Sequence, residues 1–180
     1  VMVLPDRCSH HRREVDMCQV QKLLKDSVPS TKFEFVMASP PIPDNFGSDL
    51  YFDAVFPPEG PKAQKSVRRD LNTGLTATLR LCAIQSPSIL FGIGQGATIA
   101  LAMALPRVVE AALAISYVQP EEAKELRPAW FAIKAICAIR PASTKVSNWK
   151  LLEEAVPGLT ASPVKGEPRP PQCIIKSEHA

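Results

Sequence analysis

The segment SILFGIGQGATIALAMAL, residues 88–105, constrains the fold of this chain more than any other part of the sequence. Its first part, Ile89 to Ile93, is a short apolar run of the kind that forms a buried strand. Its last part, Ala97 to Leu105, consists of small and apolar residues that favour a helix. Glycines alternate around the junction, at Gly92, Gly94 and Gly96. Because glycine permits sharp turns and close backbone approach, the segment predicts a strand, a tight turn and a helix in direct succession.

Apolar segments of similar character recur along the chain and alternate with helical patterns. The expected strands cover residues 1–4, 32–38, 89–93, 112–118, 131–139 and 173–176. The expected helices cover residues 14–25, 63–85, 97–105, 121–126 and 148–155. Since the inner strands are apolar on both faces, the pattern predicts an α/β fold, a doubly wound and mostly parallel sheet of about six strands. Any site would then lie at the carboxyl ends of the strands, near the glycine turn and the loops after Leu4 and Ile139.

Length and composition fit one globular domain spanning residues 1–180. The 180 residues are 46% hydrophobic, and a chain of this length buries roughly 70% of its extended surface. The net charge of +3, with both signs interspersed, requires no nucleic-acid partner. No apolar segment approaches the roughly 20 residues that cross a bilayer, so no transmembrane segment is expected. The sequence begins at Val1 without a signal-peptide pattern, which leaves open an N-terminally processed or incompletely traced chain.

The cysteines and histidines predict neither disulfides nor a metal site. The five cysteines are an odd number without C-x-x-C spacing, and three lie in apolar runs, which predicts reduced thiols in a soluble protein of the cytoplasm or an organelle interior. The spacing of one group near the start matches no common zinc pattern: Cys8, His10, His11 and Cys18. The run His10-His-Arg-Arg13 is better explained as the solvated start of a helix.

The glycine turn carries a motif that is similar to a known catalytic turn. Residues Gly92 to Ala97 are Gly-Ile-Gly-Gln-Gly-Ala. This motif resembles the nucleophile elbow of the small α/β-hydrolases of the carboxylesterase, acyl-protein thioesterase and fungal-type serine hydrolase group, which commonly reads G-F-S-Q-G-A. The segment Phe33 to Pro41, leading into a proline-containing loop, and the long helix after it also resemble this group. The resemblance spans most of the chain, from Val1 to His179, and implies an α/β-hydrolase-like core.

The resemblance also implies catalytic positions, and this sequence departs from the family at most of them. Such a hydrolase needs a nucleophile, an imidazole, an orienting carboxylate and backbone N–H groups for the oxyanion. The nucleophile position is Gly94, and the position of the acid, usually aspartate, is Ser143. The family's L-H-G loop after the first strand is Leu4-Pro5-Asp6-Arg7 here. The histidine position keeps its residue, as His179.

These departures imply that hydrolase chemistry is lost, because removing such a nucleophile typically costs on the order of a millionfold in rate. The expected function is that of a catalytically inactive α/β-hydrolase-like protein, an accessory or scaffold subunit with no cofactor. Its partners would be other protein subunits of a larger assembly. The expected contact surfaces are the proline-rich segments 39–61 and 163–171, with Tyr51, Phe52 and Phe56 more exposed than core residues.

Two other interpretations remain open. The run Gly-x-Gly-x-x-Ala satisfies the dinucleotide fingerprint G-x-G-x-x-G/A, and its N–H groups would hold a phosphate. The binding residues would be Gly92, Gly94, Gly96 and Ala97. However, that fingerprint should open the first βαβ unit, whereas two strands precede it here. The other interpretation is an active esterase or thioesterase whose nucleophile has moved to Ser9 or Cys8, near the expected site but without an oriented base.

Overall fold

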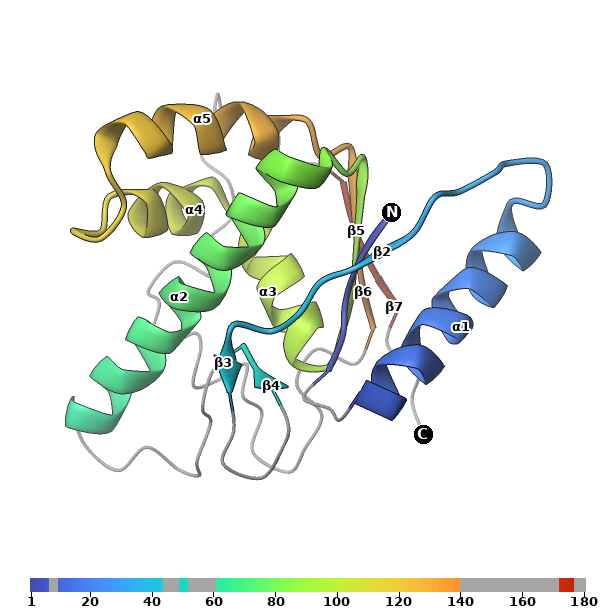
Figure 1. Cartoon of the computed structure of the whole chain (residues 1–180), viewed down its shortest axis with the longest axis horizontal. Helices are drawn as coiled ribbons and strands as arrows, with labels where there is room; N and C mark the ends of the chain where they lie inside the picture. Colours follow the sequence, from blue (N-terminus) through green and yellow to red (C-terminus); the bar gives the residue numbers. More distant parts are fainter. Residues whose placement is uncertain (7–9, 44–48, 52–60, 140–171, 177–180) are drawn as a thin grey trace.

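A five-stranded parallel sheet lies between helices on both of its faces (Figure 1). The computed structural model describes residues 1–6, 10–43, 49–51, 61–139 and 172–176. The strand order is β2-β1-β5-β6-β7, and every neighbouring pair is parallel. The strands are β1 (Met2–Leu4), β2 (Val36–Met37), β5 (Ile89–Ile93), β6 (Ala135–Ile139) and β7 (Gln172–Lys176). A separate antiparallel pair consists of β3 (Ile42–Pro43) and β4 (Asp49–Leu50).

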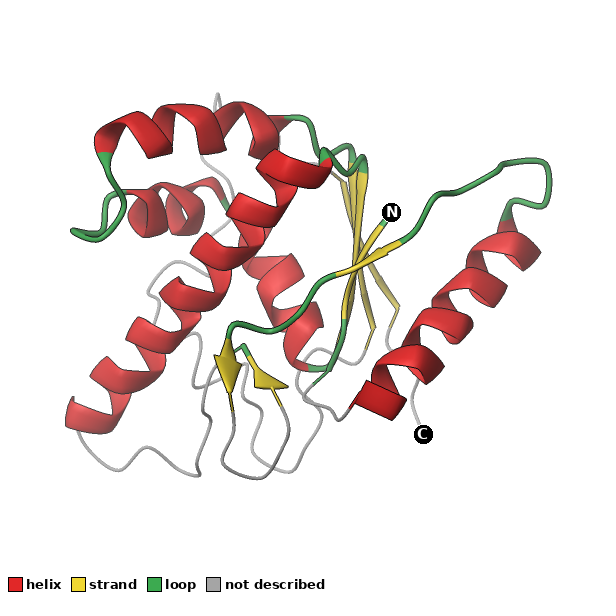
Figure 2. Ribbon diagram, viewed as in Figure 1, coloured by secondary structure: helices red, strands yellow, loops and turns green. Residues whose placement is uncertain are grey.

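The helices divide between the two faces of the sheet (Figure 2). Helix α1 (His10–Ser27) lies on one face. On the other face lie α2 (Pro61–Gln85), α3 (Gln95–Met103), α4 (Pro106–Leu113) and α5 (Pro120–Phe131). From β1 the chain first adds β2 on one side of it and later adds β5, β6 and β7 on the other side. The direction in which strands are added therefore reverses between β1 and β5. This doubly wound arrangement confirms the expected α/β class and places the reversal point beside the glycine turn.

Successive residues of the strands point to opposite faces and so build two cores. On the face of α1, Val3 and Phe91 pack against Val20 of the helix. On the other face the larger cluster takes in Leu4 and Leu90 together with apolar residues of all four helices there. In β1 all three residues are buried, and in β5 the three central residues are buried, which explains why these two strands are apolar on both faces.

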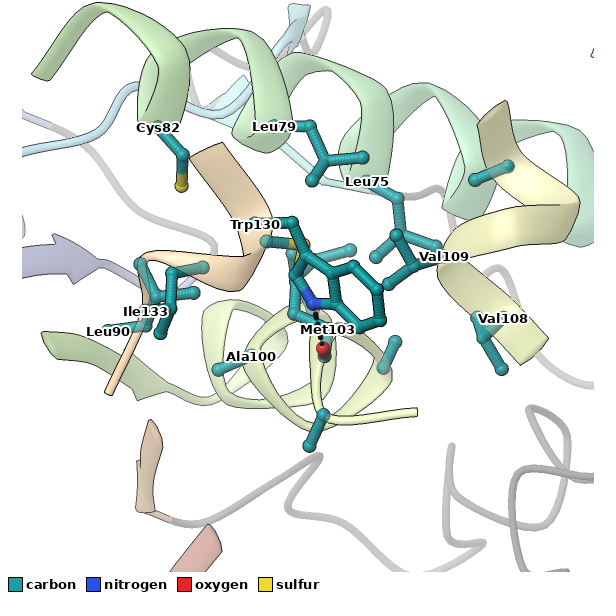
Figure 3. Close-up of a cluster of buried hydrophobic side chains, with 14 of the residues drawn as sticks. Leu75, Leu79, Cys82, Leu90, Ala100, Met103, Val108, Val109, Trp130 and Ile133 are labelled. Carbon is teal, nitrogen blue, oxygen red and sulfur yellow. Dashed lines mark hydrogen bonds between the residues drawn. The ribbon is translucent and has the colours of Figure 1, made fainter. Parts of the chain in front are cut away.

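The larger core closes around Trp130 of α5 (Figure 3). Its indole is 2% exposed and its Nε1–H donates to the carbonyl oxygen of Met103 at 2.8 Å. Leu75 and Leu79 of α2 and Val109 of α4 surround the ring. The spacing of leucines along residues 71–79 therefore identified the buried face of this helix correctly. Trp130 holds α5 against the end of α3 through both its apolar area and its hydrogen bond.

One expected strand, residues 112–118, is wrong. The chain there forms the end of α4 and a series of turns, so the described sheet has five strands rather than about six. Pro106 occupies the first turn of α4, where its missing N–H costs nothing. The buried residues of α4 then recur with helical spacing: Val108, Val109, Ala112 and Leu113. Ala112 and Leu113, at the start of the apolar run 112–118, therefore belong to the buried face of a helix, and the rest of the run lies in turns. Periodicity over so short a run does not distinguish these structures from a strand.

The other expected elements within the described residues agree in type with the structure and differ at their ends, whereas β3 and β4 were not expected from the sequence. Helix α1 begins before residue 14, α5 continues to Phe131, and β6 therefore starts at Ala135 instead of residue 131. The expected strand 32–38 is limited to Val36–Met37. The expected helix 148–155 lies outside the described residues.

Helices α3 and α4 meet at a bend of 95°. No single helix in the described part of the chain is long and apolar enough to cross a membrane, and this bent pair meets the requirement only when its two helices are taken together. Every residue of α3 is buried within the protein.

We expect Leu79→Ala to lower the free energy of unfolding by about 2–5 kcal/mol, because Leu79 is fully buried and its truncation leaves a cavity. Ile84→Ala is the matched control on the same helix, since Ile84 is 73% exposed, and should change stability by less than about 0.5 kcal/mol. Urea unfolding of both variants measures the difference. An equal loss of unfolding free energy in the two variants would contradict the packing described for α2.

Candidate functional site

The junction of β5 and α3 has the geometry of a strand-to-helix elbow. Gly94 stands between the two elements with φ 55° and ψ −118°, outside the right-handed and left-handed helical regions. Its N–H donates to the carbonyl oxygen of Ile139 at 3.1 Å, and its carbonyl oxygen accepts the N–H of Thr98 at 3.2 Å. These bonds fix the turn between the end of β6 and the first turn of α3. The positive φ explains why the turn favours glycine at this position.

The two flanking glycines allow α3 to approach the sheet closely. A Cβ on Gly92 would lie 2.7 Å from the backbone nitrogen of Ala97. A Cβ on Gly96 would lie 2.6 Å from the carbonyl oxygen of Pro5, just after β1. Both distances are shorter than those of real Cβ contacts, so a side chain at either position would push the helix away. Gly92 and Gly96 are therefore required by packing, independently of any chemistry.

The carboxylate of Asp6 occupies the space at the apex of the elbow. Asp6 follows β1 by two residues and is half-buried. Its Oδ1 accepts the backbone N–H of Gln95 at 2.8 Å, across 89 positions of sequence. A Cβ on Gly94 would overlap the Asp6 carboxylate. A side chain at residue 94 and the carboxylate of residue 6 therefore compete for one volume.

The side chain of Gln95 connects the elbow to β4. Its Oε1 accepts the backbone N–H of Tyr51 at 3.1 Å, and Gln95 is 8% exposed. Tyr51 is 1% exposed and lies against Gly74 of α2 and Ile99 of α3, so the expectation that it is exposed for contact with other proteins is wrong. A large aromatic next to a tight helix crossing is a core residue. Phe52 and Phe56 lie outside the described residues.

A second polar cluster lies beyond the carboxyl ends of β1 and β2. Arg13 in α1 is 8% exposed and its guanidinium forms an ion pair with Asp49 of β4. The same guanidinium donates to the Oγ of Ser39 at 3.4 Å. A buried cation costs free energy unless a counter-charge compensates it, and Asp49 provides that charge. The cluster joins α1 to β4 and to the segment that follows β2.

The structure brings together some of the predicted site residues. Gly92, Gly94, Gly96 and Ala97 form the elbow and the start of α3, at the edge of the sheet that the sequence predicted. The other predicted positions, Ser143, His179, Ser9 and Cys8, lie outside the described residues. The triad geometry implied by the resemblance therefore stays a prediction.

The sequence contains a signal for the position of Asp6. The loop Leu4-Pro5-Asp6-Arg7, which lacks the glycine of the L-H-G loop, carries a carboxylate. A carboxylate two residues after one strand and a bare helix N-terminus after its neighbour lie at the same edge of a parallel sheet. That juxtaposition could have predicted the contact with Gln95. The expectation of a solvated helix start at residues 10–13 is wrong for Arg13, which is 8% exposed and forms an ion pair with Asp49. The sequence around Arg13 contains no signal for this burial.

No protein-family model, curated protein or solved structure matches this chain.

Among the residues that the structure describes, no group of three histidine, cysteine or acidic side chains could hold a metal ion.

Cys82 illustrates how burial suppresses reactivity of a thiol in this chain. It lies fully buried in the larger core, and desolvation raises the pKa of its thiol to about 12. The thiolate fraction at pH 8 is therefore far lower than for an ordinary cysteine. Cys18 is an exposed thiol on α1.

We expect iodoacetamide at pH 8 to label Cys18 in the native chain and to label Cys82 only after unfolding. The exposed thiol is accessible, whereas the buried one is both shielded and protonated. Peptide mass mapping of native and urea-unfolded samples measures both sites in one experiment. Comparable native labelling of the two cysteines would show that Cys82 is not in a closed core.

Proposed function

We propose that this chain is a catalytically inactive α/β-hydrolase-like protein that serves as an accessory or scaffold subunit. One observation carries the proposal: the carboxylate of Asp6 fills the position that the side chain of a nucleophile would take at Gly94. The same carboxylate accepts the Gln95 N–H, which in an active elbow would be a donor to the oxyanion. The Asp6 carboxylate thus occupies both the space for a nucleophile and the N–H group that would bind the oxyanion.

The occupied elbow also argues against the two alternatives. A nucleotide phosphate at the start of α3 would meet the negative charge of Asp6 at the N–H group it needs. A nucleophile moved to Ser9 or Cys8 would act beside an oxyanion donor that already holds a carboxylate. Neither alternative has an observation in its favour in the described part of the chain.

The contact surface of a scaffold needs exposed apolar area. Ile84 at the end of α2 and Phe131 at the end of α5 are 73% and 55% exposed. The two helices pack against each other, and their carboxyl ends lie at the same end of the protein, by the amino ends of β5 and β6 (Figure 1). We propose this pair of helix ends as a contact surface in place of Tyr51, which is buried.

We expect Gly94→Ser to show no hydrolysis of p-nitrophenyl acetate above that of Gly94→Ala. A serine at residue 94 lacks an open oxyanion donor and lacks room beside Asp6. The alanine variant controls for the effect of a Cβ on the turn, and an active serine hydrolase is the positive control. A fluorophosphonate probe, which modifies activated serines, should label neither variant nor the unmodified chain. Turnover or labelling specific to Gly94→Ser would contradict the loss of hydrolase function.

The subunit proposal predicts that the endogenous protein purifies under native conditions in a stoichiometric complex with other proteins. Ile84→Ser and Phe131→Ser should each weaken recovery of the partners several-fold, because both remove exposed apolar area. Lys134→Ser, at a neighbouring exposed position, is the control and should leave recovery unchanged. A free monomer carrying a nucleotide or an acyl ligand would overturn the proposal.

A further inference from the structure

The β3–β4 pair is attached to the rest of the protein at its second strand. Its two strands bond to each other and do not extend the five-stranded sheet, and they lie beside the start of α3 (Figure 1). Two-stranded pairs are only marginally stable by themselves. The position of the pair therefore depends on the contacts that β4, and Tyr51 directly after it, make with α1 and α3.

One attachment is made to the elbow. The N–H of Tyr51 donates to the Oε1 of Gln95 at 3.1 Å, and both residues are buried. The chain at Tyr51 thereby covers the side chain that follows Gly94 in the first turn of α3. If β4 moves away, Tyr51 and Gln95 become exposed to water together.

The other attachment is the ion pair between Arg13 of α1 and Asp49 of β4. The Arg13 side chain is 10% exposed and that of Asp49 is 36% exposed, so the cation is the more deeply buried partner. The Nε–H of Arg13 is buried and has no hydrogen-bond acceptor among the residues that the structure describes. Glu14 lines the same cavity but is exposed to water, so its charge is screened. Compensation of the buried cation therefore depends mainly on Asp49.

We propose that the β3–β4 pair is a conformational switch over the elbow and that the negative charge of Asp49 holds it in its packed position. Without that charge, Arg13 is an uncompensated cation in a poorly hydrated site. Separation of β4 from α1 lets water reach the guanidinium and relieves this cost, whereas the five-stranded sheet stays paired. The pair then opens before the rest of the protein unfolds. This inference concerns access to the elbow and holds whether or not the chain serves in an assembly.

The test is amide hydrogen exchange of the full chain, measured residue by residue by NMR. The Tyr51 amide reports the switch, because its bond to Gln95 exists only while the pair is packed. The amide of Leu90, fully buried in β5, reports global unfolding. We expect Asp49→Asn to speed exchange at Tyr51 by about 10- to 100-fold, since losing one partner of a buried ion pair is strongly destabilising. Exchange at Leu90 should change much less.

Two further variants separate charge compensation from other effects of residue 49. Arg13→Met removes the buried cation and leaves the more exposed carboxylate, so it should speed exchange at Tyr51 less than Asp49→Asn does. Adding Arg13→Met to Asp49→Asn should slow exchange at Tyr51 again, because no buried charge is left unpaired. Asp26→Asn alters an exposed carboxylate of α1 and is the matched control, which should have no effect.

The unmodified chain gives a further comparison that does not depend on the folding of any variant. In it, the Tyr51 amide should already exchange faster than that of Leu90. Equal protection of the two amides in the unmodified chain would overturn the proposal. An equal rise at both amides in Asp49→Asn, or no slowing at Tyr51 when Arg13→Met is added, would overturn it as well.

Discussion

The close approach of three backbone segments at the β5–α3 elbow is the constraint on which most of the described structure depends. Gly92 brings the start of α3 against β5, and Gly96 brings it against the end of β1. With both glycines in place, α3 lies buried along its whole length at the centre of the protein. The other helices on that face then pack around α3, and Trp130 holds α5 to the end of it.

The same approach explains why Asp6 reaches the elbow. Because Gly96 holds α3 against the end of β1, Pro5 and Asp6 lie directly at the start of the helix. A carboxylate there meets an N–H group and a favourable dipole, and it ties the first strand to a helix 89 positions away. A hydrogen bond to a charged group is worth about 1.5–3 kcal/mol, which is substantial for a connection between a central strand of the sheet and the buried helix that packs on it.

The sequence predicted the parts of this arrangement that depend on local patterns. The apolar run at 89–93, the glycines and the leucines of α2 gave the elbow, the parallel sheet and the buried helix face correctly. The strand expected at 112–118 is wrong because a short apolar run is compatible with a helix end and turns as well as with a strand. The exposure expected for Tyr51 is wrong because a position in a proline-rich segment does not show whether the side chain packs into the core. The contact of Asp6 with Gln95 joins residues far apart in sequence, and such contacts follow from the sheet order, which local patterns do not give. The predicted triad positions Ser143 and His179 are outside the described residues.

The elbow separates the requirements of folding from those of catalysis. Packing restricts Gly92 and Gly96, because a side chain at either position collides with backbone. Chemistry of the hydrolase type would require a nucleophile at residue 94, where the neighbour of an added Cβ is instead the side chain of Asp6. A side chain at residue 94 would require the Asp6 carboxylate to move from its present position, where it accepts the N–H of Gln95. With glycine at residue 94, the turn is a structural joint between β1, β5 and α3.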